Sequence, residues 1–263
     1  GLVVLICLGL AGYVATSPER PSPESSSAAW LEPGAYQVGR AEFVFVDNSR
    51  PTSKNRGFPA KPQRTFPTTV WFPRQLDAAL PLIVHSHGIV SNRTEMAYLA
   101  ETLASHGYLV AATDFPLTSG STAGGANARD VVNQPADISF LIDSLLELRD
   151  GKKPFIGSID ESRIGLSGYS LGGLTTYLAT YHSAWRDSRI AAALAIAGPS
   201  AVFAPRFFET TPIPVLAIAG TSDALIEHSR NAADLTARAP NISVITIESG
   251  THLGFIGIAD PAF

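Results

Sequence analysis

The sequence RIGLSGYSLGGLTTYLATY, residues 163–181, contains the turn that decides the fold of this chain. The apolar run before the turn predicts a buried strand, and apolar residues three or four apart after it predict a helix. Between them, GYSLG at residues 168–172 matches the Gly-x-Ser-x-Gly pattern of a sharp strand-to-helix turn. Side chains at Gly168 and Gly172 would collide with neighbouring backbone there, and the turn exposes the hydroxyl of Ser170. The pattern marks Ser170 as a candidate nucleophile, and an ordinary glycine-rich turn is the alternative.

Apolar segments on both sides of this turn alternate between strand and helix patterns. The strands are apolar throughout, which predicts an α/β fold: a mostly parallel sheet of about eight strands with helices on both faces. We expect one of the opening strands, within residues 36–72, to be antiparallel. The expected strands are Phe43–Val46, Thr68–Phe72, Pro81–His85, Tyr108–Thr113, Arg163–Leu166, Ile190–Ala197, Val215–Ala219 and Ile242–Ile247.

Three further helices are expected from apolar stripes. The first has Met96, Leu99, Ala100 and Leu103 on one face, and Asn92 with Glu95 suggests a capping box at its start. The others are a helix that opens at Pro135, with Ile138, Leu141, Ile142 and Leu145 on its stripe, and a helix over Ala224–Arg238.

A serine nucleophile needs a base, and the base needs an orienting acid. After Ser170, the strand ends at Val215–Ala219 and Ile242–Ile247 are followed by Asp223 and His252, in the order typical of this turn. We therefore expect His252 as the base and Asp223 as the acid. Asp223 is also suited to cap a helix, and Glu248 is the reserve acid.

The negative oxygen formed during such chemistry needs two backbone N–H donors. Leu171 follows the nucleophile and should supply one, and Ile89, in the loop HSHGI at residues 85–89, should supply the other. His85 and His87 in this loop are spaced like metal ligands, but no third ligand is placed, so side chains that hold the loop are the simpler interpretation. The expected chemistry needs neither a metal nor a cofactor.

The residues quoted so far resemble the α/β-hydrolase family. Residues 85–114, residues 130–146 and GYSLGG are similar to the branch of dienelactone hydrolase-like proteins and plasma platelet-activating-factor acetylhydrolases. The turn, acid and histidine also resemble those of cutinase-type polyester hydrolases. The resemblance covers roughly Phe66 to the end of the chain. It implies Ser170, Asp223 and His252 as a catalytic triad, with Ile89 and Leu171 as oxyanion donors. Dienelactone hydrolases carry Cys where Ser170 stands, which favours ordinary esters as substrates.

The substrate is less defined by the sequence. Only residues 198–212 separate two expected strands, so no large lid domain fits there, and an open site suits bulky or polymeric esters as well as small ones. Polyesters and phospholipids with an acetyl group are the alternatives. Four aromatic side chains are candidates for a substrate wall or for the core: Tyr169, Phe203, Phe207 and Phe208.

Three other classes of protein are alternatives to an ester hydrolase. A non-catalytic binding module would not need all three triad members. A dinucleotide-binding oxidoreductase would carry its glycine motif at the first strand rather than in mid-chain. An acyltransferase shares the triad and differs only in what accepts the acyl group. The net charge of 19 − 23 = −4, with no basic stripe, argues against a nucleic-acid partner.

The 263 residues divide into a short apolar leader and one domain. Residues 1–16 suggest a signal peptide or short membrane anchor, since about 14 apolar residues fall short of the roughly 20 of a membrane span. Residues 17–30 are a Pro- and Ser-rich linker, and residues 31–263 form the α/β-hydrolase domain. We expect a secreted, periplasmic or membrane-anchored protein whose sequence continues beyond both ends. A single cysteine excludes an internal disulfide, and the oligomeric state stays open.

Overall fold

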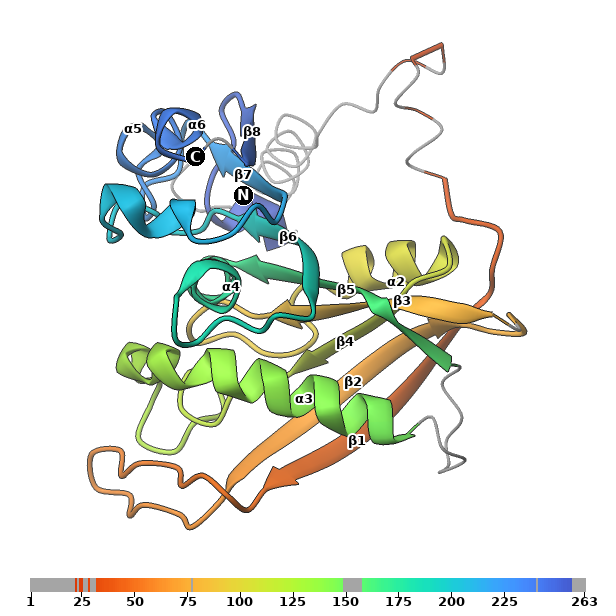
Figure 1. Cartoon of the computed structure of the whole chain (residues 1–263), viewed down its shortest axis with the longest axis vertical. Helices are drawn as coiled ribbons and strands as arrows, with labels where there is room; N and C mark the ends of the chain where they lie inside the picture. The colour runs from red at the N-terminus through yellow and green to blue at the C-terminus, as the bar shows by residue number, and fades with distance from the viewer. Residues whose placement is uncertain are drawn as a thin grey trace, which may run out of the picture.

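A twisted sheet of eight strands runs through the part of the chain that the structure describes (Figure 1). The structure is a computed structural model that describes residues 32–76, 78–148, 158–239 and 241–256, together with residues 22, 24, 25 and 28. The strand order is β1-β2-β4-β3-β5-β6-β7-β8. The strands are β1 (Val38–Asp47), β2 (Arg64–Pro73), β3 (Ala79–Ser86), β4 (Leu109–Thr113), β5 (Ser158–Tyr169), β6 (Ile190–Ile196), β7 (Val215–Gly220) and β8 (Ile242–Ile247).

Strand direction agrees with the expectation from the sequence. β2 runs antiparallel to both of its neighbours, β1 and β4, and every other pair is parallel. The carboxyl ends of β3, β5, β6, β7 and β8 therefore lie along one edge of the sheet. In open α/β sheets that edge is where loops gather the functional side chains.

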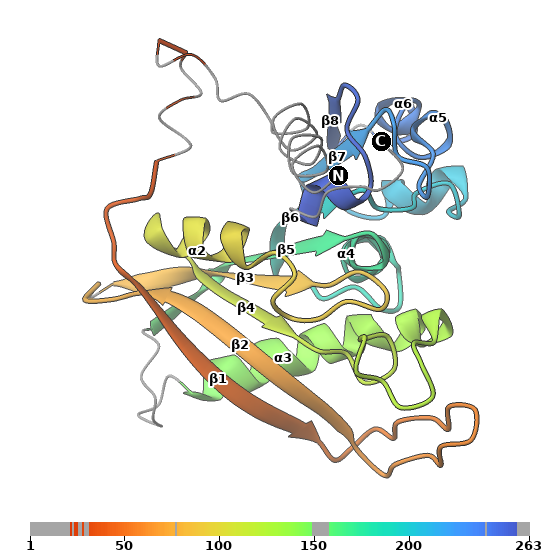
Figure 2. The ribbon, with the colours of Figure 1, turned by 180° about the vertical axis from the view of Figure 1, so that it is seen from behind.

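Helices cover both faces of the sheet, as expected. α3 (Gln134–Leu148) and α4 (Leu171–Tyr181) lie on one face and α2 (Ala97–Ser105) on the other, as the two opposite views show (Figures 1 and 2). The shorter helices are η2 (Ala128–Asn133), η3 (Pro205–Glu209), α5 (His228–Asn231), α6 (Leu235–Arg238) and η4 (Leu253–Ile256). No helix in the described part of the chain has the length and apolar character needed to cross a membrane. The signal or anchor expected at residues 1–16 lies outside the described residues.

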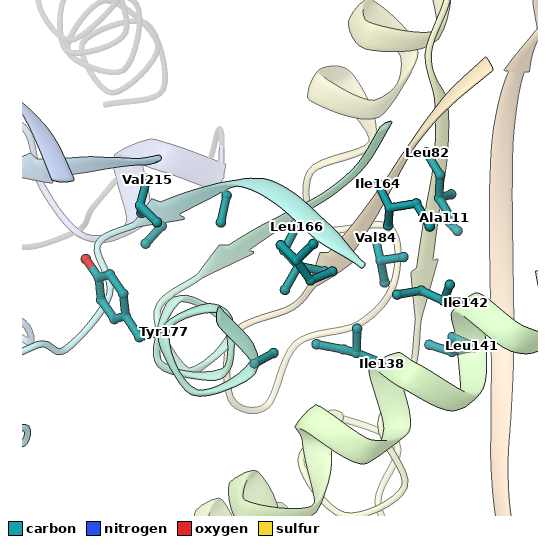
Figure 3. Close-up of a cluster of buried hydrophobic side chains, with 14 of the residues drawn as sticks. Leu82, Val84, Ala111, Ile138, Leu141, Ile142, Ile164, Leu166, Tyr177 and Val215 are labelled. Carbon is teal, nitrogen blue, oxygen red and sulfur yellow. The ribbon is translucent and has the colours of Figure 1, made fainter. Parts of the chain in front are cut away.

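The main hydrophobic core fills the space between α3, α4 and the sheet. Ile138, Leu141 and Ile142 point from α3 towards the sheet, as Figure 3 shows, and all three are fully buried. The side chains that they meet come from the middle of the sheet: Leu82, Val84, Ala111, Ile164 and Leu166. This packing accounts for the apolar stripe of α3, and it fixes the central strands whose ends carry the site.

A buried ionic cluster joins the β1–β2 end of the sheet to α3. The guanidinium of Arg64, with 1% of its side chain exposed, forms ion pairs with Asp130 at 2.7 Å and with Asp137 at 2.6 Å. Arg50 approaches the same Asp137 at 2.7 Å and Asp47 also at 2.7 Å. Buried charges are stable only when paired in this way, so the cluster ties the loop after β1 to the start of α3.

The expected capping box of α2 is wrong. The helix starts at Ala97 after Met96, whose side chain makes no capping hydrogen bond. The side chain of Asn92 instead accepts hydrogen bonds from the amide of Thr94 at 2.8 Å and from its hydroxyl at 2.6 Å. The carboxylate of Glu95 turns away from the helix start towards Gly88 and His85.

The continuous helix expected over Ala224–Arg238 is also wrong, because the structure has two single turns there, α5 and α6. The side chain of Asn231 accepts hydrogen bonds from the amides of Ser200 and Ala201, and its carbonyl accepts one from the Ser200 hydroxyl. Since this carbonyl is used by a distant loop, α5 ends at Asn231. An apolar stripe in the sequence does not reveal such a tertiary contact.

Candidate active site

The turn between β5 and α4 holds Ser170 in a strained backbone conformation. Its φ is 54° and its ψ is −116°, values that residues other than glycine rarely adopt. A Cβ on Gly168 would lie 2.1 Å from the carbonyl oxygen of Gly172, and one on Gly172 would lie 1.8 Å from that of Ser86. Both glycines are therefore required by close backbone contacts, as the sequence pattern predicted.

Ser170, His252 and Asp223 form a continuous chain of hydrogen bonds. The Oγ of Ser170 lies 2.9 Å from Nε2 of His252, and Nδ1 of His252 lies 2.7 Å from Oδ2 of Asp223. All three residues are buried, with 8%, 5% and 6% of their surfaces exposed. An ionised Asp223 accepts a hydrogen bond from Nδ1–H of His252. The lone pair of Nε2 is then free to accept a hydrogen bond from the Ser170 hydroxyl. The geometry is that of a serine hydroxyl next to an oriented base.

Direct contacts between two loops bring Asp223 and His252 together. The amide of Ser222 donates to the carbonyl of Gly250 at 3.0 Å, and the amide of Thr221 donates to that of Ile247, also at 3.0 Å. The backbones approach so closely that a Cβ on Gly220 would lie 2.0 Å from the Gly250 oxygen. The loops after β7 and β8 thus hold the acid and the histidine at a fixed separation.

The second oxygen of Asp223 organises its own loop. Oδ1 accepts hydrogen bonds from the amides of Leu225 at 2.9 Å and Ile226 at 2.7 Å. Burial opposes the ionisation of this carboxyl, but the hydrogen bonds from His252 and the two amides outweigh it and lower the pKa of Asp223. The two hypotheses for Asp223 therefore coexist, since one oxygen faces His252 and the other closes a turn.

Tyr169 supports the histidine from behind. Its ring centroid lies 5.0 Å from that of His252, and its hydroxyl donates to the His252 carbonyl at 2.8 Å. With 3% of its surface exposed and its ring against His252, Tyr169 is placed to hold the histidine, and its assignment to a substrate wall stays a prediction. No sign of this contact is visible in the sequence, because Tyr169 and His252 are 83 positions apart.

The backbone amides of Ile89 and Leu171 lie next to the nucleophile. Leu171 is the first residue of α4 and follows Ser170 directly. Ile89 follows Gly88, whose Cβ, if present, would lie 3.4 Å from the Cβ of Ser170. Within the described ranges, neither amide donates a hydrogen bond to a protein group. Both N–H groups are thus unused by the protein groups that the structure describes.

Both histidines of the loop after β3 are engaged by protein groups. His85 contacts the Ser167 hydroxyl through Nδ1 at 2.8 Å and Glu95 through Nε2 at 3.3 Å. His87 contacts the Gly88 carbonyl through Nδ1 at 2.6 Å and accepts from the Phe115 amide through Nε2 at 3.1 Å. Among the described residues, no group of three or more His, Cys, Asp or Glu side chains is placed to hold a metal ion. These contacts favour the interpretation that both histidines hold the loop.

Of the two alternatives for Phe203, Phe207 and Phe208, a substrate wall or the core, their packing favours the core. Phe208 is fully buried, and Phe203 stacks on Phe207 with ring centroids 3.8 Å apart. All three pack against aromatic rings of α4, those of Tyr177 and Tyr181. The reserve acid, Glu248, is exposed, and Asp223 occupies the position beside Nδ1 of His252.

Exposed aliphatic side chains occupy the loops after β3, β6 and β7, a feature that the sequence pattern did not reveal. The exposed fractions are 40% for Ile89, 66% for Val90, 67% for Val202 and 70% for Leu225. We call these four residues the apolar rim. Ile89 is an expected oxyanion donor, and Leu225 lies two residues after Asp223.

The sheet order, the helices on its two faces and the turn at Ser170 define the protein as an α/β-hydrolase. A family model described as PET hydrolase-like (PETase) matches residues 44–255, and the chain belongs to this family. The family comprises hydrolases that act on esters. No curated protein matches the sequence.

Proposed function

We propose that the protein is a serine carboxylic-ester hydrolase with Ser170 as nucleophile, His252 as general base and Asp223 as orienting acid. The observation that carries this proposal is the hydrogen-bonded chain from Ser170 Oγ through both ring nitrogens of His252 to Asp223, at 2.9 and 2.7 Å. The family of ester-acting hydrolases to which the chain belongs supports the same reaction.

In the proposed reaction, Ser170 Oγ attacks the carbonyl carbon of the ester while His252 Nε2 takes its proton. The carbonyl oxygen becomes negative and accepts hydrogen bonds from the amides of Ile89 and Leu171. The tetrahedral intermediate collapses, the C–O bond to the alcohol breaks, and His252 returns the proton to the leaving alkoxide. Water then attacks the acyl-enzyme with the same base, which releases the acid and restores Ser170.

The apolar rim favours a hydrophobic and bulky ester over a small charged one. Ile89 and Leu225 are exposed on the loops that carry the proposed oxyanion donor and the proposed acid, so they are suited to contact an apolar substrate bound there. Together with the PET hydrolase-like family, this supports a polyester chain as the substrate. A lipid ester presents a similar surface and is the second candidate.

A substrate panel tests the proposal. Purified protein is assayed on p-nitrophenyl esters of increasing acyl length, an acetylated phospholipid and a polyester film, with Ser170→Ala as the control. We expect hydrolysis of short and medium esters and release of soluble products from the film, all lost in the variant. Preference for the phospholipid would make lipid esters the substrate class. Acyl transfer to an added alcohol in place of hydrolysis would indicate an acyltransferase. No reaction with any ester would overturn the proposal.

A further inference from the structure

A buried carboxylate lies directly behind the loop that carries Ile89. Oε1 of Glu95 accepts the N–H of Gly88 at 2.9 Å, and only 2% of the Glu95 side chain is exposed. Its other oxygen, Oε2, is buried and has no hydrogen-bond partner in the described part of the chain. Burial of a carboxylate costs free energy unless hydrogen bonds or ion pairs offset it. The hydrogen bond from the Gly88 amide is one of the contacts that offset this cost for Glu95.

The carbonyl of the same glycine is held from the opposite side. Nε2 of His87 accepts a hydrogen bond from the amide of Phe115 at 3.1 Å, so the proton of the neutral ring is on Nδ1. Nδ1–H then donates to the Gly88 carbonyl at 2.6 Å. Burial lowers the pKa of His87, which keeps the ring in this neutral form.

The planarity of the peptide bond links these contacts to the site. The Gly88 carbonyl and the Ile89 N–H belong to one planar trans peptide group and point in opposite directions. Fixing the carbonyl towards His87 therefore directs the Ile89 N–H away from His87. Fixing the Gly88 N–H on Glu95 prevents the preceding peptide from rotating. The loop is fixed again one residue later, where the Val90 amide donates to the Thr118 carbonyl at 2.9 Å.

We infer that Glu95 is a positioning residue, which holds Gly88 so that the Ile89 N–H is directed at the oxyanion formed on the substrate. The inference rests on the proposed function, because an oxyanion forms only if the protein hydrolyses esters through Ser170. His85 assists by approaching the same Oε1 with Nε2 at 3.3 Å while its Nδ1 contacts the Ser167 hydroxyl at 2.8 Å. Glu95 does not contact the substrate, and it acts through the geometry of the loop.

Three substitutions separate a positioning role from a role of charge. Glu95→Gln keeps an oxygen acceptor at the same distance and loses the charge. Glu95→Asp keeps the charge but is one methylene shorter, and Glu95→Leu removes the acceptor. If geometry decides, kcat falls little in Glu95→Gln and about 10- to 100-fold in Glu95→Asp and Glu95→Leu, less than the roughly 100- to 1000-fold expected when an oxyanion donor is lost outright. A role of charge gives the reverse order, with Glu95→Asp more active than Glu95→Gln.

Substrate binding and transition-state binding are measured separately in the same proteins. KM should change less than about threefold, because the oxyanion bond forms only in the transition state. Affinity for an alkyl phosphonate or boronic acid that mimics the tetrahedral intermediate should weaken by the same factor as kcat. Leu145→Ala, on the buried face of α3, serves as the control for lost stability and should keep both kcat per folded molecule and inhibitor affinity.

The outcomes distinguish this inference from the proposed function. Absence of ester hydrolysis in the wild-type protein overturns the proposed function. Hydrolysis in the wild type that is lost in Ser170→Ala, combined with unchanged kcat and inhibitor affinity in Glu95→Asp and Glu95→Leu, overturns the role of Glu95 alone. If Glu95→Leu does not fold, the order of Glu95→Gln and Glu95→Asp still decides.

Discussion

The hydroxyl of Tyr169 donates a hydrogen bond to the backbone carbonyl of His252 at 2.8 Å, so the residue before the nucleophile holds the residue proposed as its base. The contact joins the end of β5 to the loop after β8, two segments at separate places in the sheet. It makes the distance between Ser170 and His252 depend on one phenol group as well as on the strands.

Replacing Tyr169 by Phe should therefore impair catalysis more than folding. The ring packing against His252 remains, but the loop loses one hydrogen bond of about 0.5–1.5 kcal/mol. We expect kcat to fall about threefold to tenfold with little change in KM, measured on a soluble ester. Tyr181→Phe is the matched control, because its hydroxyl also donates to a carbonyl, that of Ile213 at 3.2 Å, away from the site. Equal activity of the two variants would contradict this role of Tyr169.

The strained backbone at Ser170 predicts an inactive variant of higher stability. Glycine adopts a φ of 54° without steric cost, whereas alanine keeps the strain. Ser170→Gly should be more stable than Ser170→Ala by about 1 kcal/mol, or roughly 2–4 °C in Tm. Thermal denaturation followed by circular dichroism measures the difference. A Ser170→Gly protein that melts below Ser170→Ala would show that any strain is smaller than the cost of glycine's greater freedom in the unfolded chain.

The acid limb of the pH profile should report an imidazole and not Asp223. The pKa of Asp223 lies below its usual value of 3.8, so the carboxylate stays ionised through mild acid. The stabilisation that its ionised form gives the fold is complete above that pH and is lost only as the pH falls through the lowered pKa. We expect kcat/KM to rise between about pH 5 and 8, the range in which histidines commonly titrate, and to stay high in mild alkali.

Asp223→Asn tests the same arrangement from the acid side. The side-chain amide of asparagine is isosteric with the carboxylate, but its NH2 group can only donate. When this group faces Nδ1, it favours the wrong tautomer of His252. Turnover should fall on the order of 10⁴-fold while the fold persists. Activity within tenfold of wild type would remove Asp223 from the proposed mechanism.

The ionic cluster around Arg64 predicts a large loss of stability from one substitution. Arg64→Leu leaves the carboxylate of Asp130 buried without its guanidinium and weakens the neutralisation of Asp137. The expected cost is about 3–5 kcal/mol in the free energy of unfolding, measured by urea denaturation. Arg163→Leu is the control, because its ion pair with Asp160 is exposed and should contribute less than about 1 kcal/mol. Similar costs for both variants would contradict the importance of burial.

Much of the fold could be predicted because helices cover both faces of the sheet, which leaves its central strands apolar throughout. Central strands such as β3 and β6 read as continuous apolar runs, and α3 shows a stripe whose members are fully buried. The turn at Ser170 could be predicted because Gly-x-Ser-x-Gly is a local pattern, although the contact that requires Gly172 is with Ser86, on a different strand.

The errors concern side chains whose partners are far away in the sequence. Asn231 ends α5 because Ser200 uses its carbonyl, and Glu95 leaves the helix start because Gly88 offers a buried amide. For Phe208 the sequence left both a substrate wall and the core open, because an aromatic residue in a short loop suits either. Local pattern does not separate these alternatives, since each is decided by tertiary contacts.

The position of β8 has a consequence for how the protein loses activity on heating. Ser170 sits beside strands in the middle of the sheet, whereas His252 follows β8, the edge strand in the described part of the chain, where Ile245 and Ile247 are 45% and 41% exposed. Segments with few buried contacts open locally before the whole fold unfolds. Amides of β8 should exchange with deuterium faster than those of β5. Catalysis should then fail reversibly at temperatures where the central strands are still intact.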